Sequence, residues 1–529
     1  MIKGFRQIAS LTAISRVFGF VRDIAYSHFF GANALLDAWT IAFKIPNLAR
    51  RLFGEGAAAA SFIPVYSEAL HRDKQQAKQL VNTVVTVLFV LLAAIILISE
   101  ALIWGYYKFF STTGETRLVL SLTSIMLPYM LLVCMVAILA GILHVHRHFA
   151  APAAAPIVLN LFIISSILLT GWVLKLQTRE QLFFVAVAVL IAGLTQIAIQ
   201  IPPLRASGVS IRPAWKTQSD AFKKIIILMG PMILGLTVTQ INTLADDLIA
   251  WWFSASAEKG TSFVLLGNSI AYPLKRGSVS HLYYSQRLYQ LPLGVFGISL
   301  ATAVFPVMSS FSAKKDFSGL GKMVSKGLCC CIFIAIPATI GLVAIARPLI
   351  TLAFQHGQFS AKDTDMVAWT LLFYALGLCG YFGQQVLTRA FYSMQDSKTP
   401  VKSALIAVVT NIVLNLTLIW LLGTGGLAAA TALCSYLQVV ILATALRRRL
   451  GDSILNGLAR AFAKTIAATL CMSAAIALTL WLSKNYADIL KLLLVVPTAA
   501  AVYLLAAKAL DIEMLSLLTS GKQPNGQKA

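Results

Sequence analysis

Apolar segments of about 20 residues recur along the whole of this chain, a length at which an α-helix spans the hydrocarbon core of a bilayer. Such helices are stable in lipid because they satisfy their own backbone hydrogen bonds. Only 12% of the residues are charged and 58% are hydrophobic, whereas soluble domains are about a quarter charged. The segments are too long and too continuous for the alternating strands of a membrane β-barrel. The sequence therefore predicts an all-α polytopic membrane protein.

Hydropathy predicts about 14 transmembrane helices. They cover residues 5–30, 34–70, 80–110, 117–147, 152–174, 180–204, 222–253, 286–312, 325–354, 364–394, 400–422, 425–446, 460–483 and 487–509. The second helix is expected to break around Pro46 and Gly54–Gly56. A broken helix at membrane depth is tolerated only where it lines protein or water.

Lysine and arginine are concentrated in every second loop. Because basic residues favour cytoplasmic loops, this pattern places both termini in the cytoplasm. It also accounts for most of the net charge of +23, so the basic balance does not predict nucleic-acid binding. The outside loop 254–286 departs from the pattern, since it carries Lys259, Lys275 and Arg276 against Glu258. The charge rule does not account for that loop.

A short internal repeat predicts two halves of similar structure. Residues 57–67 (AAAASFIPVYS) resemble residues 299–309 (SLATAVFPVMS), and each segment follows a Phe-Gly pair. The offset contains an even number of helices, so the halves keep the same orientation, as in transporters that hold substrate between two halves near mid-depth. We expect two pseudo-symmetric six-helix lobes plus two extra C-terminal helices. The predicted limits are 1–204 for the N-lobe, 205–224 for a cytoplasmic linker, 225–449 for the C-lobe, 450–512 for the last two helices and 513–529 for a cytoplasmic tail.

The first two predicted helices carry many charged side chains for their depth in the membrane. Between Ser15 and Gly56 these are Arg16, Arg22, Asp23, Asp37, Lys44, Arg50, Arg51 and Glu55. Ionised groups at membrane depth are costly, and they usually pair, face water or mark a substrate path. A structural Arg–Asp pair explains one such pair but not the surplus of arginine. Arg50 and Arg51 also fit a positive-inside anchor, and the Lys44 amine can extend to the interface.

The excess of arginine predicts an anionic cargo. Guanidinium contacts phosphate through two parallel hydrogen bonds and keeps its charge at any physiological pH. A cavity with this charge attracts a diphosphate and repels the cations that multidrug exporters carry. Arg287 in the eighth predicted helix can point into the same cavity. The predicted substrate-binding residues are Arg16, Arg22, Asp23, Asp37, Arg50, Arg51 and Arg287.

The seventh predicted helix contains a candidate site for a coupling ion. Asn242 and Asp246 are four residues apart, so both place an oxygen on one helix face, which suits sodium or a proton carrier. The adjacent Asp247 is an alternative partner, and an interhelical salt bridge is an alternative role. Nucleophile-elbow, P-loop and zinc motifs are absent from the sequence. We therefore predict a transporter with no catalytic residue, resident metal or cofactor, and not an ATP-driven pump.

Several stretches carry a specific family resemblance. They read SRVFGFVRD at 15–23, DAWTIAFKIPNLARRLFGEGA at 37–57, FIPVYSE at 62–68, SVSHLYYSQRLYQLPLGVFGISLATAVFP at 278–306 and RAFYSMQDSKTPV at 389–401. They resemble the MurJ (MviN) family of lipid II flippases, within the multidrug/oligosaccharidyl-lipid/polysaccharide exporter superfamily.

The resemblance implies that the chain flips lipid II, an undecaprenyl-diphosphate-linked disaccharide pentapeptide, from the inner to the outer leaflet of the bacterial cytoplasmic membrane. It implies alternating access of the two lobes and a groove beside the last two helices for the lipid tail. By the motif match, the family's functionally important positions are Arg16, Arg22, Asp37, Arg50 and Arg287, and Asp23 lines the cavity.

The resemblance leaves the energy source open between sodium, protons and the membrane potential, with Asp246 as the candidate acid. Membrane lipids and cell-wall synthesis proteins are the other expected partners. Two features depart from the family pattern: Gln286 stands where many relatives have Asp, and residues 255–275 look like an insertion. The alternative functions are an exporter of another polyprenyl-diphosphate oligosaccharide, a multidrug exporter of the same superfamily, and a non-transporting membrane scaffold.

Overall fold

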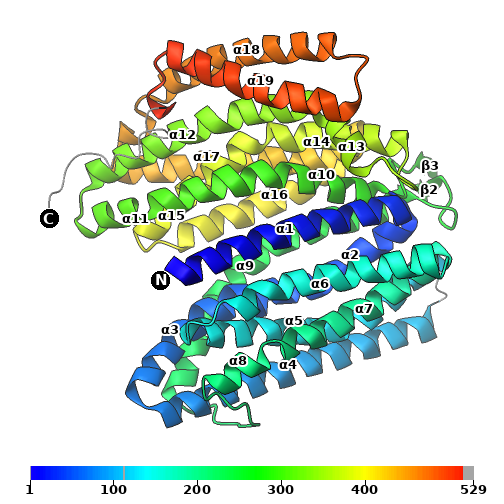
Figure 1. The fold of residues 1–529 in the computed structure, drawn as a ribbon, viewed down its shortest axis with the longest axis vertical. Helices are drawn as coiled ribbons and strands as arrows, with labels where there is room; N and C mark the ends of the chain where they lie inside the picture. The colour runs from blue at the N-terminus through cyan, green and yellow to red at the C-terminus, as the bar shows by residue number, and fades with distance from the viewer. Residues whose placement is uncertain (1, 111–113, 516–529) are drawn as a thin grey trace. The chain divides into compact units, whose positions relative to one another are not determined.

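A computed structural model gives the structure of the protein and describes residues 2–110 and 114–515 (Figure 1). The part of the predicted cytoplasmic tail beyond residue 515 lies outside the described residues. The described chain divides into two compact units. The first contains the residues up to Ser280 together with His356–Phe359, and the second contains His281–Gln355 and the residues from Ser360 onward.

Helices make up nearly all of the first unit. They are α1 (Ile2–Phe30), α2 (Ala34–Ala49), the π-helical turn η1 (Arg50–Gly56), α3 (Ala57–Arg72), α4 (Lys74–Phe109), α5 (Gly114–Val145), α6 (Ala150–Leu168), η2 (Leu169–Val173), α7 (Thr178–Ala198), α8 (Ile201–Ala206) and α9 (Asp220–Trp252). Four short strands follow α9. They are β1 (Ser254–Ala255), paired in parallel with β4 (Leu274–Lys275), and the antiparallel hairpin of β2 (Ser262–Leu265) and β3 (Asn268–Ala271).

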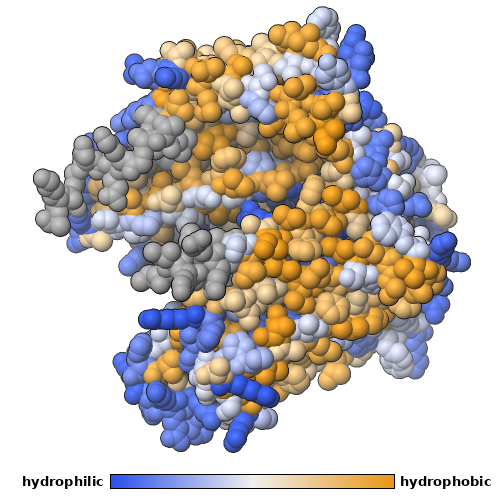
Figure 2. Space-filling model, in the orientation of Figure 1, coloured by the Kyte–Doolittle hydropathy of each residue, from blue (hydrophilic) through white to orange (hydrophobic). Residues whose placement is uncertain are grey.

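The core of the first unit forms around α5, which packs against α2, α4 and α7 (Figure 1). α5 is apolar on nearly every side and is largely buried, which is typical of a central helix. α6 and α7 instead present exposed apolar side chains, among them Phe184 and Leu194. In Figure 2 the visible surface over these two helices is mostly hydrophobic along its middle, and hydrophilic residues gather toward the helix ends. This is the surface expected for contact with lipid.

The second unit begins within α10 (Ser278–Pro292) and is also helical. Its other elements are η3 (Leu293–Ile298), α11 (Ser299–Ala313), α12 (Phe317–Ala344), α13 (Ala346–Phe354), α14 (Ala361–Leu376), α15 (Leu378–Ser393), α16 (Lys398–Leu422), α17 (Thr424–Leu450), η4 (Asp452–Leu455), α18 (Leu458–Leu482) and α19 (Asp488–Ala509). α12, α15 and α17 pack around one apolar cluster that includes Val386 and Leu446. α18 and α19 lie side by side on α12, where a second cluster includes Phe333 and Tyr503 (Figure 1).

The number of candidate membrane spans is roughly consistent with the predicted 14 but does not confirm that number. Ten helices of the described residues are long and apolar enough to cross a membrane, or up to 11 if α14 and α15, bent by 41°, form one span. The difference is greatest near the N-terminus. α2 and α3 have 16 residues each, and α1 carries Arg16, Arg22 and Asp23 along its length. The hydropathy prediction nevertheless covered these helices, at 5–30 and 34–70.

The second predicted helix is broken, as expected, but not at Pro46. That proline lies inside α2, and the irregularity is the π-helical turn η1. In the second unit the π-helical turn η3 separates α10 from α11 in the same way. The two repeat segments therefore each begin the helix that follows a π-helical turn, at Ala57 and at Ser299. This correspondence supports the internal repeat.

α9 belongs to the first unit, although the sequence assigned it to the C-lobe at 225–449. It packs there against α2, α3 and η1. Polar contacts hold it in place, since Lys44 pairs with Asp247 and Arg51 binds Gln240. The limits of the lobes predicted from the sequence otherwise stay a prediction.

Candidate substrate site

Arg22 and Asp23 form a buried ion pair on α1. Arg22 Nη2 lies 2.7 Å and Nε 3.1 Å from Asp23 Oδ1, and Nη1 donates to Asn160 Oδ1 of α6 at 3.0 Å. Arg22 is 8% exposed and Asp23 is 3% exposed. The two neighbours in sequence therefore neutralise each other, and the amide of Asn160 fixes the direction of the guanidinium group. The sequence predicted that Asp23 partly neutralises an arginine, but it gave no indication of Asn160.

Asn160 of α6 also lies close to Gly19 of α1. A Cβ atom at this position would lie 3.7 Å from Asn160 Nδ2, which is an ordinary van der Waals contact. Asn160 also donates from Nδ2 to the carbonyl of Ser15 at 3.4 Å. Asn160 of α6 thus forms hydrogen bonds with α1 at two positions, Ser15 and Arg22.

Arg16 is exposed, in contrast to Arg22. The two arginines are six residues apart, which is about 9 Å along a helix axis at 1.5 Å per residue. Because Asp23 neutralises Arg22, the net positive charge near α1 comes from Arg16. Arg16 is therefore the cation of this pair that is open to an anionic ligand in the conformation described.

Arg50 and Arg51 lie in η1, where the chain leaves α2. Arg50 Nε donates to Asn47 Oδ1 at 3.3 Å, and Arg51 Nη1 donates to Gln240 Oε1 of α9 at 2.9 Å. The Arg51 side chain is exposed at this contact. Arg51 thus connects η1 to α9, which is more than a loop anchor would do.

Asp37 is fully buried near the start of α2 and caps the first turn of α10. Its Oδ2 accepts the amide of Gly277 at 2.7 Å, and its Oδ1 accepts the amide and the hydroxyl of Ser280 at 2.7 and 2.6 Å. A carboxylate at a helix N-terminus is favoured both by these donors and by the helix dipole. The close approach requires glycine at Gly277, since its φ is +98° and a Cβ atom there would lie 2.4 Å from the carbonyl oxygen of Ala32. Asp37, predicted to bind substrate, has a structural role in this conformation.

Lys44 of α2 and Asp247 of α9 form an ion pair between helices. Lys44 Nζ also donates to the carbonyl of Thr243 at 2.8 Å. The Asp247 side chain is 3% exposed and that of Lys44 is 23% exposed. The interhelical salt bridge that the sequence left as an alternative is therefore present, and Asp247 forms it. The two candidate coupling residues lie on the same stretch of α9. Asp246, next to Asp247, is buried, and Asn242 is half-buried.

Replacing Lys44 with methionine should lower the unfolding free energy by about 3 kcal/mol, because the buried Asp247 loses its partner. Removing both charges, as K44M/D247L, should recover at least half of that loss. Thermal unfolding in detergent measures both effects. K402M, on an exposed face of α16, is the matched control and should change nothing. Equal losses in the single and double variants would show that the two side chains do not interact.

Arg287 lies on α10 in the second unit and is half-buried. Its Nη2 is 3.2 Å from the hydroxyl of Tyr283, and the guanidinium carbon lies 4.7 Å from the centre of the Tyr283 ring. Stacking on tyrosine holds the charge in one orientation. The neighbouring Gln286, a departure from the family pattern, donates from Nε2 to the hydroxyl of Tyr374 at 3.1 Å. Gln286, which stands where an acid was expected, thus forms a hydrogen bond to α14.

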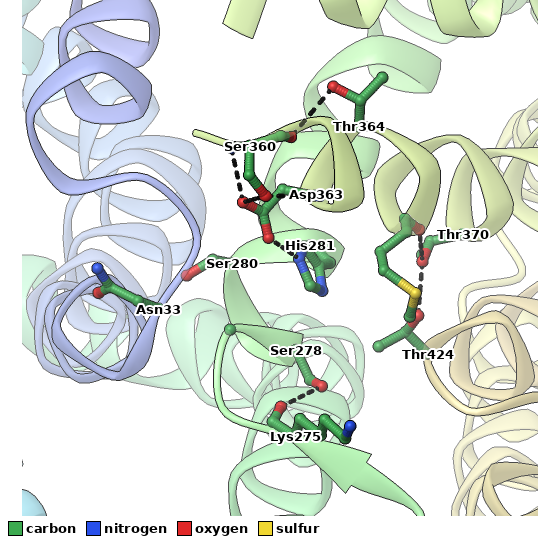
Figure 3. A network of polar contacts seen from close by, with 12 residues as sticks. Asn33, Lys275, Ser278, Ser280, His281, Ser360, Asp363, Thr364, Thr370 and Thr424 are labelled. Atoms are coloured by element: carbon green, nitrogen blue, oxygen red, sulfur yellow. Dashed lines mark hydrogen bonds and ion pairs between the residues drawn. The ribbon is translucent and has the colours of Figure 1, made fainter. Parts of the chain in front are cut away.

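A second polar network in this unit was not predicted. His281 Nε2 lies 3.0 Å from Asp363 Oδ1, and Ser360 Oγ donates to Asp363 Oδ2 at 2.7 Å. Figure 3 shows His281 and Ser360 both directed at the Asp363 carboxylate. Asp363 and Ser360 form the capping box of α14.

Two of the basic residues in the loop that follows α9, Arg276 and Lys259, have local partners. Arg276 binds Glu115 at 2.8 Å, and its guanidinium carbon lies 3.6 Å from the centre of the Trp251 ring. The amine of Lys259 lies 4.9 Å from the centre of the Trp252 ring. Burial, with the nearby Arg276, lowers the pKa of Lys259 below its ordinary value. These two basic residues are thus held by aromatic rings and by an acid from α5.

Long apolar helices around buried arginine and aspartate side chains are typical of a polytopic membrane transporter. The fold agrees. A solved structure titled "Lipid II flippase MurJ, inward closed conformation" matches with a TM-score of 0.77 at 24% identity, over 95% of this chain and 99% of that chain. An inward-facing multidrug resistance MATE family transporter of the MOP superfamily matches with a TM-score of 0.63 at 13% identity, over 84% of this chain and 98% of that chain.

Sequence comparison narrows the class to one family. The family model described as "Lipid II flippase MurJ" matches residues 26–497. The probable lipid II flippase MurJ of Vibrio cholerae serotype O1 is 34% identical over 448 residues, 82% of this chain and 81% of that protein. The corresponding protein of Haemophilus influenzae is 29% identical over 485 residues, 88% of this chain and 90% of that protein. The chain belongs to the MurJ lipid II flippase family.

Proposed function

We propose that this protein moves lipid II from the inner to the outer leaflet of the bacterial cytoplasmic membrane by alternating access. Family membership over residues 26–497 is the observation that carries this proposal. The cargo is an amphiphile whose diphosphate must leave one aqueous face and reach the other. An uncompensated charge at mid-depth costs several kcal/mol, so the carrier has to supply opposite charge along the path.

In the proposed function, arginine side chains supply that charge. Arg16 is exposed on α1, and Arg22, six residues further along the same helix, is held by Asp23 and Asn160. In the second unit Arg287 is oriented by Tyr283. Guanidinium groups held in one orientation lose little entropy when they bind a phosphate. We assign Arg16, Arg22 and Arg287 to the diphosphate.

Arg50 and Arg51 have a proposed role at the entrance, since they follow the last turn of α2 and Arg51 already contacts α9. Asp37 has a proposed role in the movement of α10, whose first turn it caps. The energy source is proposed to act on α9 through Asp246 and Asn242, with sodium, protons or the membrane potential as the candidates. Both termini are proposed to be cytoplasmic on the charge pattern of the loops.

Growth complementation tests the proposal. The chain should restore growth to a bacterium depleted of its own lipid II flippase, and R287A should fail while reaching the membrane in normal amount. A charge-preserving variant, R287K, should restore growth in part, because it keeps the cation but loses the planar contact with Tyr283. Normal growth of the depleted strain with R287A would contradict the assigned role.

An exporter of another polyprenyl-diphosphate oligosaccharide is the alternative favoured by a specific observation. The arginines recognise a diphosphate, which all these carriers share, and do not read the sugar. Competition distinguishes the two, since an unrelated oligosaccharide on the same lipid should displace lipid II poorly if the protein is a lipid II flippase.

A further inference from the structure

A basic pocket lies in the second unit, and none of the residues assigned to the diphosphate lines it. It is formed where the ends of α12 and α18, the start of α19 and the helix α13 meet, near the loop that joins α18 to α19 (Figure 1). Its volume is about 440 Å³. Pro348 and Leu480 contribute apolar walls, and Arg347, Lys484, Asp488 and Lys491 contribute the charges.

Positive charge predominates in this pocket. Lys491 pairs with Asp488 at 2.9 Å, and Arg347 pairs with Asp365 of α14 at 2.9 Å, where both side chains are largely exposed. Within the described residues Lys484 forms no ion pair, although it lines the same pocket. Three basic and two acidic groups therefore leave one positive charge in excess, with Lys484 as its source. Exposed pairs such as Arg347–Asp365 contribute little stability, so Arg347 can turn to an anion at little cost.

The surroundings of the pocket are those of a membrane interface. The pocket lies at helix ends, and the nearby Trp481 and Tyr486 are 65% and 53% exposed. Exposed tryptophan and tyrosine gather at the level of lipid headgroups. Leu482 and Leu493, on the two helices that meet here, are exposed as well, at 65% and 63%. A ligand in the pocket would therefore have its charged part among cations and its acyl chains along α18 and α19.

We propose that this pocket binds the phosphate group of an anionic phospholipid, as a second phosphate site of the protein. Arg347, Lys484 and Lys491 contact the phosphate oxygens, and the apolar walls receive the glycerol end of the acyl chains. Juxtamembrane basic residues attract anionic lipids by about 1 kcal/mol each near the surface. A pocket adds direct hydrogen bonds to this attraction, which makes the contact specific for a phosphate with a free negative charge.

Binding of short-chain lipids to the purified full chain tests the proposal. The probe is dioctanoyl phosphatidylglycerol, and dioctanoyl phosphatidylcholine is the zwitterionic control with the same chains. K484Q/K491Q should weaken phosphatidylglycerol binding about tenfold or more, because charge-assisted hydrogen bonds contribute about 1.5–3 kcal/mol each. K508Q, an exposed lysine elsewhere on α19, is the matched control and should bind as the unmodified protein does.

A variant that should raise the affinity for phosphatidylglycerol distinguishes loss of binding from simple misfolding. D488N removes the acid that pairs with Lys491, so it should tighten phosphatidylglycerol binding by about twofold to fivefold. Equal affinity for the two lipids, or unchanged affinity in K484Q/K491Q, would overturn the proposal. If inorganic phosphate alone stabilised the protein as well as the lipid does, the ligand would be free phosphate and the lipid assignment would be wrong.

Discussion

Replacing Arg22 with alanine is expected to abolish lipid II transport and to weaken lipid II binding about tenfold, because a charge-assisted hydrogen bond contributes about 1.5–3 kcal/mol and Asp23 already occupies part of the guanidinium group. The same change leaves Asp23 buried without its cation, which should lower the unfolding free energy by about 3 kcal/mol. Binding of fluorescent lipid II to the purified protein and thermal unfolding measure the two effects.

Two further variants separate binding from folding. R16A removes an exposed cation, so it should weaken lipid II binding about tenfold with no change in thermal unfolding. N160A keeps the charge of Arg22 but removes its fixed orientation, so it should have an intermediate effect on binding. If R16A and R22A both bound lipid II with unchanged affinity, α1 would not contact the diphosphate.

Replacing Asp37 with alanine is expected to lower the unfolding free energy by about 4 kcal/mol, since two amides and a hydroxyl lose their acceptor at about 1–3 kcal/mol each. The first turn of α10 depends on these three hydrogen bonds. We therefore expect D37A to lose function through loss of folded protein, seen as a lower amount in the membrane and a lower melting temperature.

Smaller changes at the same place should give graded results. S280A removes one of the three donors and should cost about 1 kcal/mol. D37N keeps one oxygen but places an amide group against a backbone amide, so it should be closer to D37A than to S280A. A D37A protein as stable as the unmodified chain would show that Asp37 does not hold α10, and its role would then be in substrate binding.

The sequence predicted the positions of most helices well, but it predicted few of the side-chain contacts. The apolar runs located α4–α7 and α16–α19 to within six residues, since lipid exposure requires continuous apolar sequence. The helices that carry the charged residues were harder to delimit. α10 begins at Ser278, eight residues before the predicted start of that span, because its first turns are polar and are capped by Asp37.

The charged residues of the site were predictable, but most of their contacts were not. Charge at membrane depth singled out Arg22 and Asp37, because each is expensive there. Asn160 gave no such signal, since one asparagine in an apolar helix has many possible neighbours. The partners of Asp37 are backbone amides, which leave no trace in a sequence pattern. The Lys44–Asp247 pair was predictable only as one of several alternatives.

Flipping of fluorescent lipid II in reconstituted vesicles tests the central claim most directly. The labelled lipid starts in the inner leaflet, and a membrane-impermeant quencher reports its arrival in the outer leaflet, with a sodium gradient and a membrane potential imposed separately. One charge moved across 100 mV gains about 2.3 kcal/mol, so a potential-driven step should be evident in the rate. We predict rapid quenching with the unmodified chain and the rate of protein-free vesicles with R16A/R22A. A rate with R16A/R22A equal to that of the unmodified chain would contradict binding of the diphosphate by these arginines, and no flipping by the unmodified chain under any gradient would contradict the proposed function.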